Sequence, residues 1–330
     1  MAIRVVCYGL GPIGLGIARL AYARKGIEIV GAIDIDPAKE GHDLGELLGT
    51  VPLGVLVSAD ASAVLEQTRP HVVLHATGSA LEHVLPQFQS LVRAGVDVVS
   101  TCEELSFPWK TQQRFINELH ALAQQHQVTL LGTGINPGYA MDALPLMLTA
   151  PCAFVHSVKV LRVVDAARRR GPLQRKVGAG LSTEAFAARV ADGSVRHVGL
   201  PESLQMLAAG LGWNLDQTDD LIEPMLAEQQ ITTDIVHVEP GQVAGVRQVA
   251  RGLRNGVEVL RLELRMYVGA RDPQDSVTID GDPPVQMTIA GGMHGDIATA
   301  AMMINVLPSL RSAAPGVVTM SDIALPHYWE

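Results

Sequence analysis

The feature that most constrains the fold is a glycine-rich segment between a β-like run and a helical pattern. The β-branched run Ile3–Tyr8 is followed directly by six residues with the spacing GxGxxG, and apolar residues then recur at helical intervals. The first glycine of such a turn permits a tight bend, the second lets the backbone approach a pyrophosphate, and the third lets helix and strand pack closely. We therefore expect a Rossmann-type βαβ unit that binds a dinucleotide. The expected cofactor loop consists of Gly9, Leu10, Gly11, Pro12, Ile13 and Gly14.

An acidic segment supports the same interpretation, because Asp34-Ile35-Asp36 follows the second β-like run, Ile27–Ile33. A carboxylate at this position accepts hydrogen bonds from the hydroxyls of an adenosine ribose. Asp34 is the first candidate for this hydrogen bond, and Ile35 and Asp36 are expected to contact the cofactor beside it. The carboxylate repels a 2′-phosphate and no arginine follows immediately, so NAD is the expected cofactor, while Lys39 leaves the use of NADP open. The simpler alternative is a strand–helix turn followed by a solvated acidic loop.

Length and composition predict an α/β fold with two domains. The chain has 330 residues, which is longer than a domain built on a single hydrophobic core usually is. Hydrophobic residues make up 48% of the chain but aromatic residues only 4%, a composition typical of buried parallel strands covered by helices. We expect an N-terminal Rossmann domain with a parallel sheet over residues 1–150. An α+β substrate and dimerisation domain with a largely antiparallel sheet should cover 151–294, and a C-terminal helix within about 295–330 should pack back on the first domain.

Individual elements follow from the hydrophobic periodicity. In the second half we expect a long strand over Val155–Val164, a helix over Glu202–Leu211, and a hairpin at Asn255-Gly256, a dipeptide that accepts the two positive φ angles of a type I′ turn. The last helix is expected to be capped by Asp296 and to end before Pro308. The expected parallel strands are Ile3–Tyr8, Ile27–Ile33, Val55–Val57, Val72–His75, Val96–Ser100 and Val128–Leu131.

Charge and cysteine content exclude several classes of protein. The formal net charge of -9 at pH 7 disfavours nucleic acid and anionic membranes as partners, and no apolar stretch is long enough to predict a membrane span. Three scattered cysteines form neither a disulfide framework nor a zinc site, so we expect a cytoplasmic protein without a metal. The basic run Arg168-Arg169-Arg170 could hold a substrate carboxylate, but a solvated loop or an interface is the simpler interpretation.

Polar residues that follow the fourth, fifth and sixth expected strands are candidates for the nicotinamide site. In open α/β sheets the ligand lies outside the carboxyl ends of the strands. His75 and His294 are further candidates for ligand contact, although a lone histidine is more often structural. The three segments are Ala76-Thr77-Gly78-Ser79, Thr101-Cys102-Glu103-Glu104 and Thr133-Gly134-Ile135-Asn136-Pro137-Gly138.

Two of these segments also have a purely structural interpretation. Thr101 and Glu104 have the spacing of a capping box, in which the threonine caps a helix and the glutamate reaches back to the threonine N–H. Asn136 followed by Pro137 has the pattern of an N-cap with proline at the first helical position. Capping and a role in chemistry are compatible, so both interpretations stay open for each segment.

Taken together, these residues resemble the family of 2,4-diaminopentanoate dehydrogenases and related amine dehydrogenases, within the larger dihydrodipicolinate reductase-like group. The resemblance extends over nearly the whole chain. Its most specific parts are the Ser-Thr-x-Glu-Glu and Gly-Thr-Gly-x-Asn-Pro-Gly strings. The matching segments are Gly9–Gly14, Ala32–Pro37, Ser100–Pro108, Gly132–Gly138, Arg162, Asp165, Arg169–Gly178 and Gly292–Ala301.

The resemblance implies an NAD(P)-dependent homodimer that reversibly deaminates an amine to a ketone and ammonia. One glutamate of the pair Glu103-Glu104 would be the catalytic carboxylate, and Glu104 is the better match in position. We also expect substrate contacts from Glu103, Thr133 and Asn136. From their place after the fourth, fifth and sixth strands, Ala76, Thr77, Gly78, Thr101, Cys102 and Asn136 are the expected cofactor contacts outside the glycine loop and the acidic segment.

Two other functions are compatible with the same cofactor domain. A dihydrodipicolinate reductase-like imine or enamine reductase is one, although the paired-histidine-and-lysine motif of those reductases is replaced here by Ala167-Arg168-Arg169-Arg170. The other is a dinucleotide sensor without catalysis. A requirement for ammonia separates the amine dehydrogenase from the first, and turnover separates it from the second.

Overall fold

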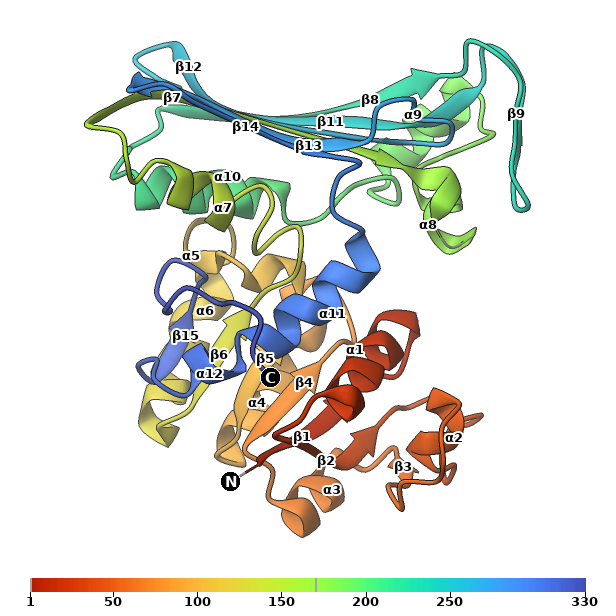
Figure 1. The fold of residues 1–330 in the computed structure, drawn as a ribbon, viewed down its shortest axis with the longest axis vertical. Coiled ribbons are helices and arrows are strands. Elements are labelled where there is room, and N and C mark those ends of the chain that lie inside the picture. Colours follow the sequence, from red (N-terminus) through yellow and green to blue (C-terminus); the bar gives the residue numbers. More distant parts are fainter. Residues whose placement is uncertain (1, 170) are drawn as a thin grey trace. The chain divides into compact units, whose positions relative to one another are not determined.

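The computed structural model describes residues 2–169 and 171–330, which form two compact units (Figure 1). The first unit combines the chain up to Tyr139 with the C-terminal segment His294–Glu330, and the second is Ala140–Met293. Both termini therefore belong to the same unit. The functional domain limits of 1–150 and 151–294 stay a prediction.

The first unit is built on a seven-stranded sheet in which every neighbouring pair of strands is parallel. The expected Rossmann architecture is thus confirmed. In sheet order the strands are β15 (Gly316–Val318), β6 (Thr129–Gly132), β5 (Asp97–Ser100), β4 (Val72–His75), β1 (Ile3–Tyr8), β2 (Ile27–Ile33) and β3 (Val57–Ser58).

Helices cover both faces of this sheet, because the chain winds outward from β1 in one direction and from β4 in the other through right-handed crossovers. On one face α1 packs beside α11, and on the other α4 packs beside α6 (Figure 1). The helices of the first unit are α1 (Pro12–Ala23), α2 (Leu44–Leu48), α3 (Ala61–Thr68), α4 (Leu81–Arg93), α5 (Pro108–Thr111), α6 (Gln113–His126), α11 (Gly295–Asn305) and α12 (Leu307–Leu310), with a 3-10 turn at Glu103–Leu105.

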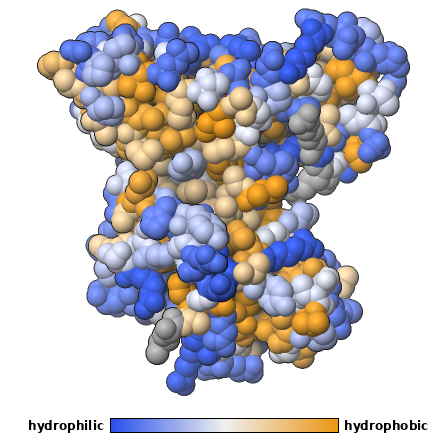
Figure 2. Space-filling view, in the orientation of Figure 1, coloured by the Kyte–Doolittle hydropathy of each residue, from blue (hydrophilic) through white to orange (hydrophobic). Residues whose placement is uncertain are grey.

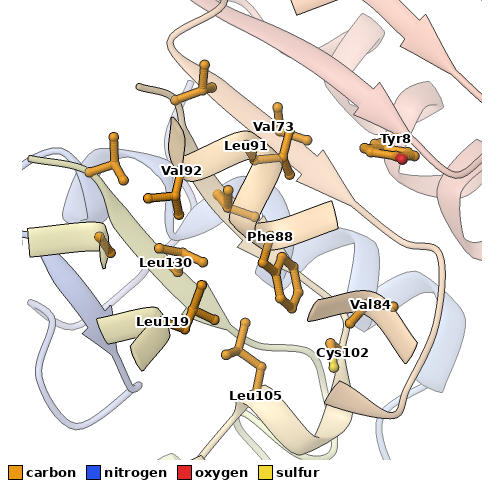
Figure 3. Close-up of a cluster of buried hydrophobic side chains, with 14 of the residues drawn as sticks. Tyr8, Val73, Val84, Phe88, Leu91, Val92, Cys102, Leu105, Leu119 and Leu130 are labelled. Atoms are coloured by element: carbon orange, nitrogen blue, oxygen red, sulfur yellow. The ribbon is translucent and has the colours of Figure 1, made fainter. Parts of the chain in front are cut away.

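A hydrophobic cluster joins α4 and α6 to the sheet (Figure 3). Phe88 of α4 is fully buried, and its helix presents apolar residues at intervals of three and four, as the sequence predicts. Cys102 and Leu105, from the loop after β5, are also buried in this cluster. Two glutamates, Glu103 and Glu104, therefore lie between two residues anchored in the core.

The C-terminal segment contains the expected helix, which ends before Pro308 as predicted, and a short strand that was not expected. Helix α11 ends at Asn305, and the short strand β15 then pairs with β6 and adds a seventh strand to the sheet. The cap also differs, because His294 rather than Asp296 is the N-cap and its Nδ1 accepts the Ile297 N–H at 3.5 Å. A strand of three residues is too short to show a period in the sequence, which explains why it was missed.

The second unit contains a six-stranded, mostly antiparallel sheet, as expected. Only β7 and β12 pair in parallel. The Asn255-Gly256 hairpin is confirmed, with φ angles of 51° and 75°. In sheet order the strands are β14 (Val285–Ala290), β13 (Gln274–Asp282), β7 (Phe154–Asp165), β12 (Val257–Tyr267), β11 (Val243–Arg254) and β8 (Gln217–Leu226).

One face of this sheet is covered by helices, and α10 packs on β11 and β12 (Figure 1). The opposite face carries mainly hydrophilic side chains, seen along the top of Figure 2. The helices of this unit are α7 (Ala143–Leu148), α8 (Gly171–Lys176), α9 (Thr183–Ala191) and α10 (Leu200–Gly210), with a 3-10 turn at Ala166–Arg168; β9 (Ile231–Thr232) pairs with β10 (His237–Val238). None of the helices described in either unit is long and apolar enough to cross a membrane.

Candidate functional site

The glycine loop has a backbone that only glycine allows at two of its three positions. Gly9 has a φ of +89°, and a Cβ atom there would lie 2.6 Å from the carbonyl oxygen of Ala76. A Cβ atom on Gly14 would lie 1.7 Å from the carbonyl oxygen of Gly9. These glycines therefore let β1, β4 and the start of α1 pack closely.

Gly11 has a different role in the loop, because a Cβ atom there would meet nothing within 4 Å. It is the N-cap of α1, and within residues 2–169 and 171–330 no side chain bonds the free N–H groups of the first helical turn. Open space beside unbonded N–H groups at a helix N-terminus is the arrangement that holds a phosphate. The residues present thus fit the pyrophosphate of a dinucleotide, as the sequence predicts.

Asp34 lies at the end of β2, directly beside this loop, and is 8% exposed. Its Oδ2 accepts the Leu10 N–H at 2.6 Å, and its Oδ1 accepts the Asp36 N–H at 2.9 Å. Lys39 places Nζ 3.1 Å from the same Oδ2. Burial alone would raise the pKa of Asp34, but these hydrogen bonds and the charge of Lys39 outweigh burial and hold the pKa below its usual value. The carboxylate is therefore ionised at the place where a ribose would bind.

The neighbours of Asp34 are more open to solvent. Ile35 is 81% exposed, although it is a large apolar residue. The side chain of Asp36 is 45% exposed and lies 3.3 Å from Lys39 Nζ. An exposed apolar side chain beside the Asp34 carboxylate fits a flat heterocycle such as adenine.

A buried hydrogen-bond network joins the ends of β4 and β5. His75 Nδ1 lies 2.8 Å from Ser100 Oγ, which also accepts the Cys102 N–H at 3.0 Å. His75 Nε2 lies 2.7 Å from Gln87 Oε1, and the Thr77 hydroxyl donates to the same oxygen at 2.6 Å. The network holds Thr77 and the Cys102 backbone, which belong to two of the three segments predicted to face the nicotinamide.

His75 itself is fully buried, which lowers its pKa to about 4. The imidazole is neutral at physiological pH and has no surface for a ligand, so its role in the network is structural. Ala76 and Gly78, which flank Thr77, shape the loop after β4. Ala76 donates its N–H to the Tyr8 carbonyl at 2.7 Å, and a Cβ atom on Gly78 would lie 3.1 Å from Val84.

Of the two interpretations of Thr101 and Glu104, the capping box does not form. The 3-10 turn that follows β5 begins after Cys102, and no side chain caps it. Glu104 instead accepts the N–H of Leu81 on Oε2 at 2.7 Å, at the first residue of α4. The glutamate therefore caps a different helix, which the strand order brings beside it.

Glu104 is nevertheless placed to contact a ligand. Its side chain is half-buried, and across residues 2–169 and 171–330 no group donates a hydrogen bond to its Oε1. Thr101 and Glu103 are half-buried beside it. The thiol of Cys102 is buried and bonds the Ser79 carbonyl at 3.3 Å, and burial raises its pKa to about 12. The thiol therefore stays neutral, and Cys102 contributes through its backbone and its packing.

The segment after β6 forms a compact turn, so the alternative interpretation of Asn136-Pro137 as a helix start is wrong. The next helix, α7, begins only at Ala143 and is capped by Asp142. Thr133 is 4% exposed, and its hydroxyl donates to the sulfur of Met320 at 3.1 Å. Asn136 is half-buried in the turn.

Three contacts in this region are not visible from the sequence. Thr299 Oγ1 of α11 accepts the Ile135 N–H at 3.3 Å, Met320 holds Thr133, and the Ser79 carbonyl accepts the Glu104 N–H at 3.2 Å. The partners lie far apart along the chain, so no local motif marks them. All the predicted site residues belong to the first unit. Arg170 of the basic run lies outside the described residues, and among those described no cluster of metal-ligating side chains occurs.

Two family models match different parts of the chain. The model of the 2,4-diaminopentanoate dehydrogenase C-terminal domain matches residues 139–330. This chain belongs to the 2,4-diaminopentanoate dehydrogenase family. The model of the dihydrodipicolinate reductase N-terminus matches residues 3–105, the part that carries the glycine loop and Glu104.

Individual relatives agree with this family. The 2,4-diaminopentanoate dehydrogenase of Acetoanaerobium sticklandii is 29% identical over 98% of this chain and 94% of its own length. The solved amine dehydrogenase of Mycobacterium smegmatis is 28% identical, with a TM-score of 0.88 over 100% of this chain and 98% of its own. A 4-hydroxy-tetrahydrodipicolinate reductase of Moorella thermoacetica is 30% identical, but over only 44% of this chain. As a member of the 2,4-diaminopentanoate dehydrogenase family, the chain is an oxidoreductase that uses NAD(P).

Proposed function

We propose that the chain catalyses the reversible oxidative deamination of an amine to a ketone and ammonia, with Glu104 as the catalytic carboxylate. The observation that carries this proposal is the position of Glu104 after β5. Its Oε2 is held by the Leu81 N–H at 2.7 Å, while no described group donates to its Oε1. A half-buried carboxylate with one fixed and one available oxygen is suited to move a proton and to pair with a cation.

The overall reaction converts the amine, water and NAD(P)⁺ into the ketone, ammonia, NAD(P)H and one proton. The nicotinamide, when bound, supplies the hydride acceptor. Loss of hydride from the carbon that bears the nitrogen leaves a cationic iminium, with which the Glu104 carboxylate pairs. Water then adds to that carbon. Glu104 accepts the proton that the water loses and returns it to the nitrogen. As ammonia leaves, the hydroxyl on the carbon gives up its remaining proton to Glu104 and becomes the ketone oxygen, and this is the one proton that the overall reaction releases.

The remaining predicted residues position the two reactants. The loop from Gly9 to Gly14 would hold the pyrophosphate, with Gly11 facing it and with Gly9 and Gly14 shaping the backbone. Asp34, Ile35 and Asp36 would hold the adenosine. The nicotinamide would be held by Ala76, Thr77, Gly78, Thr101, Cys102 and Asn136, and the substrate by Glu103, Thr133 and Asn136. Because the Thr133 hydroxyl is engaged by Met320, we assign the contribution of Thr133 to the backbone of its turn.

A homodimer in the cytoplasm is part of this proposal. The face of the six-stranded sheet without helices exposes Leu221 to 46% beside the paired charges of Arg247 and Glu223. Apolar residues among charges of both signs make a surface that complements a second copy of itself. A symmetric dimer through this face would cover it.

A second candidate is an imine reductase of the dihydrodipicolinate reductase kind, favoured by the match of residues 3–105 to that family's N-terminal model. Such an enzyme reduces a preformed double bond and needs no ammonia. Glu104 would then pair with a substrate that already carries the C=N bond.

The deciding experiment measures NADH oxidation with a panel of ketones, in the presence and absence of ammonium. It also measures NAD reduction with alkylamines, cyclic amines, amino acids and diamines. An amine dehydrogenase requires ammonium in the first assay and reduces NAD in the second. Oxidation of NADH with a cyclic imine in the absence of ammonium, without any activity on ketones plus ammonium, would favour the imine reductase. Binding of NADH without turnover of any compound would indicate a sensor.

A further inference from the structure

Lys39 occupies an unusual position at the adenosine end of the predicted cofactor site. Its Nζ lies 3.1 Å from Asp34 Oδ2 and 3.3 Å from Asp36 Oδ2. The side chain is 23% exposed, so it lies at the surface of the unit while its ammonium group contacts both carboxylates. The tight turn that places it is closed by the Lys39 N–H, which donates to the Asp36 carbonyl at 2.9 Å.

The acceptor capacity of Asp34 is almost fully used in this arrangement. A carboxylate oxygen accepts about two hydrogen bonds. Oδ2 already accepts from the Leu10 N–H and from Lys39 Nζ, and Oδ1 accepts from the Asp36 N–H. One acceptor position on Oδ1 is left, whereas a ribose with free 2′- and 3′-hydroxyls offers two donors.

Of the three donors on Asp34, only Lys39 is free to leave. The Leu10 and Asp36 N–H groups belong to the backbone of the glycine loop and of the turn after β2, and losing them would unfold those segments. Lys39 donates from the end of a flexible four-carbon stem. An NAD ribose therefore gains its second acceptor only by displacing the Lys39 ammonium group.

Resting on the use of NAD(P) by this chain, we propose that Lys39 sets its selectivity between the two dinucleotides. With NAD, the ribose hydroxyl takes the place of Lys39 on Asp34 Oδ2. With NADP, the ammonium group turns from the carboxylates to the 2′-phosphate, a dianion that Asp34 and Asp36 would otherwise repel. Lys39 thus opposes NAD binding slightly and makes NADP binding possible.

The test compares Lys39→Ala with the unchanged protein by titrating each with NADH and NADPH and following nucleotide fluorescence. Without Lys39, we expect the Kd for NADPH to rise by roughly 10-fold or more, because a charge-assisted contact to the phosphate is lost. The Kd for NADH should stay the same or fall. In the unchanged protein the NADPH affinity should also decrease with added salt more steeply than the NADH affinity.

Two probes isolate the 2′-phosphate from the rest of the cofactor. Competition by 2′,5′-ADP should weaken strongly in Lys39→Ala, while competition by 5′-ADP should not. Lys39→Arg should retain NADPH binding, since a guanidinium pairs well with a phosphate. Lys25→Ala is the matched control, because Lys25 is an exposed lysine of the same unit that pairs only with Glu330 at 3.3 Å.

Equal changes in the NADH and NADPH affinities of Lys39→Ala, or an unchanged NADPH affinity, would overturn the role of Lys39. If the unchanged protein bound neither dinucleotide, the cofactor assignment itself would be wrong. The two failures are therefore distinguishable in one titration series.

Discussion

At the scale of single residues, two polar side chains near the carboxyl end of the sheet have contrasting environments. Glu104 is half-buried, with one oxygen bonded to the Leu81 N–H. His75 is fully buried and neutral, and both of its nitrogens are engaged by protein groups. The first environment suits exchange of protons with a substrate, and the second suits a fixed connection between strands.

Glu104→Gln should leave the fold and the NAD affinity in place but lower amine oxidation by roughly two or more orders of magnitude. The amide oxygen still accepts the Leu81 N–H, so the free energy of unfolding should change by less than about 1–2 kcal/mol. An amide neither takes a proton nor pairs with an iminium. Steady-state kinetics, NADH titration and urea unfolding check the three parts.

Glu103→Gln is the neighbouring control for this substitution. If Glu104→Gln turned over normally while Glu103→Gln were inactive, the catalytic role would belong to Glu103. Normal turnover by both variants would contradict the proposed mechanism.

The buried His75 predicts a pH dependence of stability. Its pKa is lowered from 6.5 to about 4 in the folded protein by burial, so between these values the unfolded chain binds more protons. The stabilisation is fully present above pH 6.5 and is lost as the pH falls towards 4, at up to about 1.4 kcal/mol per pH unit. His75→Gln should be less stable at pH 7.5 but show a flatter decline between pH 6.5 and 4.5. Urea unfolding at several pH values measures both slopes, and equal slopes would contradict a neutral buried imidazole.

At the scale of elements, the turn between β1 and α1 contains glycines with two different roles. Gly9 and Gly14 are required by the packing of the fold, whereas Gly11 leaves space for a ligand. Gly14 is packed against the Gly9 carbonyl, whereas Gly11 faces open space. Both belong to the same motif, so the sequence alone treats them alike. Their different surroundings in the structure predict different consequences of substitution.

Gly11→Val should fold normally, because a Cβ atom at this position meets nothing within 4 Å. The added side chain would occupy the space of the pyrophosphate, so binding of NADH and NADPH should both be lost. Gly14→Val is the comparison, since its Cβ would overlap the Gly9 carbonyl and the variant should lose several kcal/mol of stability. Thermal unfolding and fluorescence titration separate the two effects. NADH binding by Gly11→Val with unchanged affinity would rule out the assigned pyrophosphate site.

At the scale of the whole molecule, the outer face of the six-stranded sheet is organised by charge. Glu263 lies at its centre and bonds Arg247, Arg261 and Arg265. Burial alone would raise the pKa of Glu263, but hydrogen bonds from these arginines outweigh burial and lower the pKa to about 2. The network therefore stays charged down to strongly acidic pH and holds the exposed face in one arrangement.

Leu221→Arg should convert the proposed dimer to a monomer, because it places a charge at an exposed apolar position of this face. Tyr22→Arg is the matched control, since Tyr22 is 44% exposed against 46% for Leu221 but lies on α1 of the first unit. Light scattering at micromolar concentration measures the mass of each variant. A monomeric unchanged protein would refute the dimer, and a dimeric Leu221→Arg variant would move the interface elsewhere.

The sequence by itself determined the Rossmann unit, its glycine loop, the acidic end of β2 and the Asn255-Gly256 hairpin. These features depend on local periodicity and on turn chemistry, which neighbouring residues carry. Only the tertiary structure decided that Glu104 caps α4 at Leu81, that His75 is buried between strand ends, and that a strand after α12 extends the sheet. Those outcomes depend on which strands become neighbours. Strand order is set by the packing of the whole unit and cannot be predicted from short local segments.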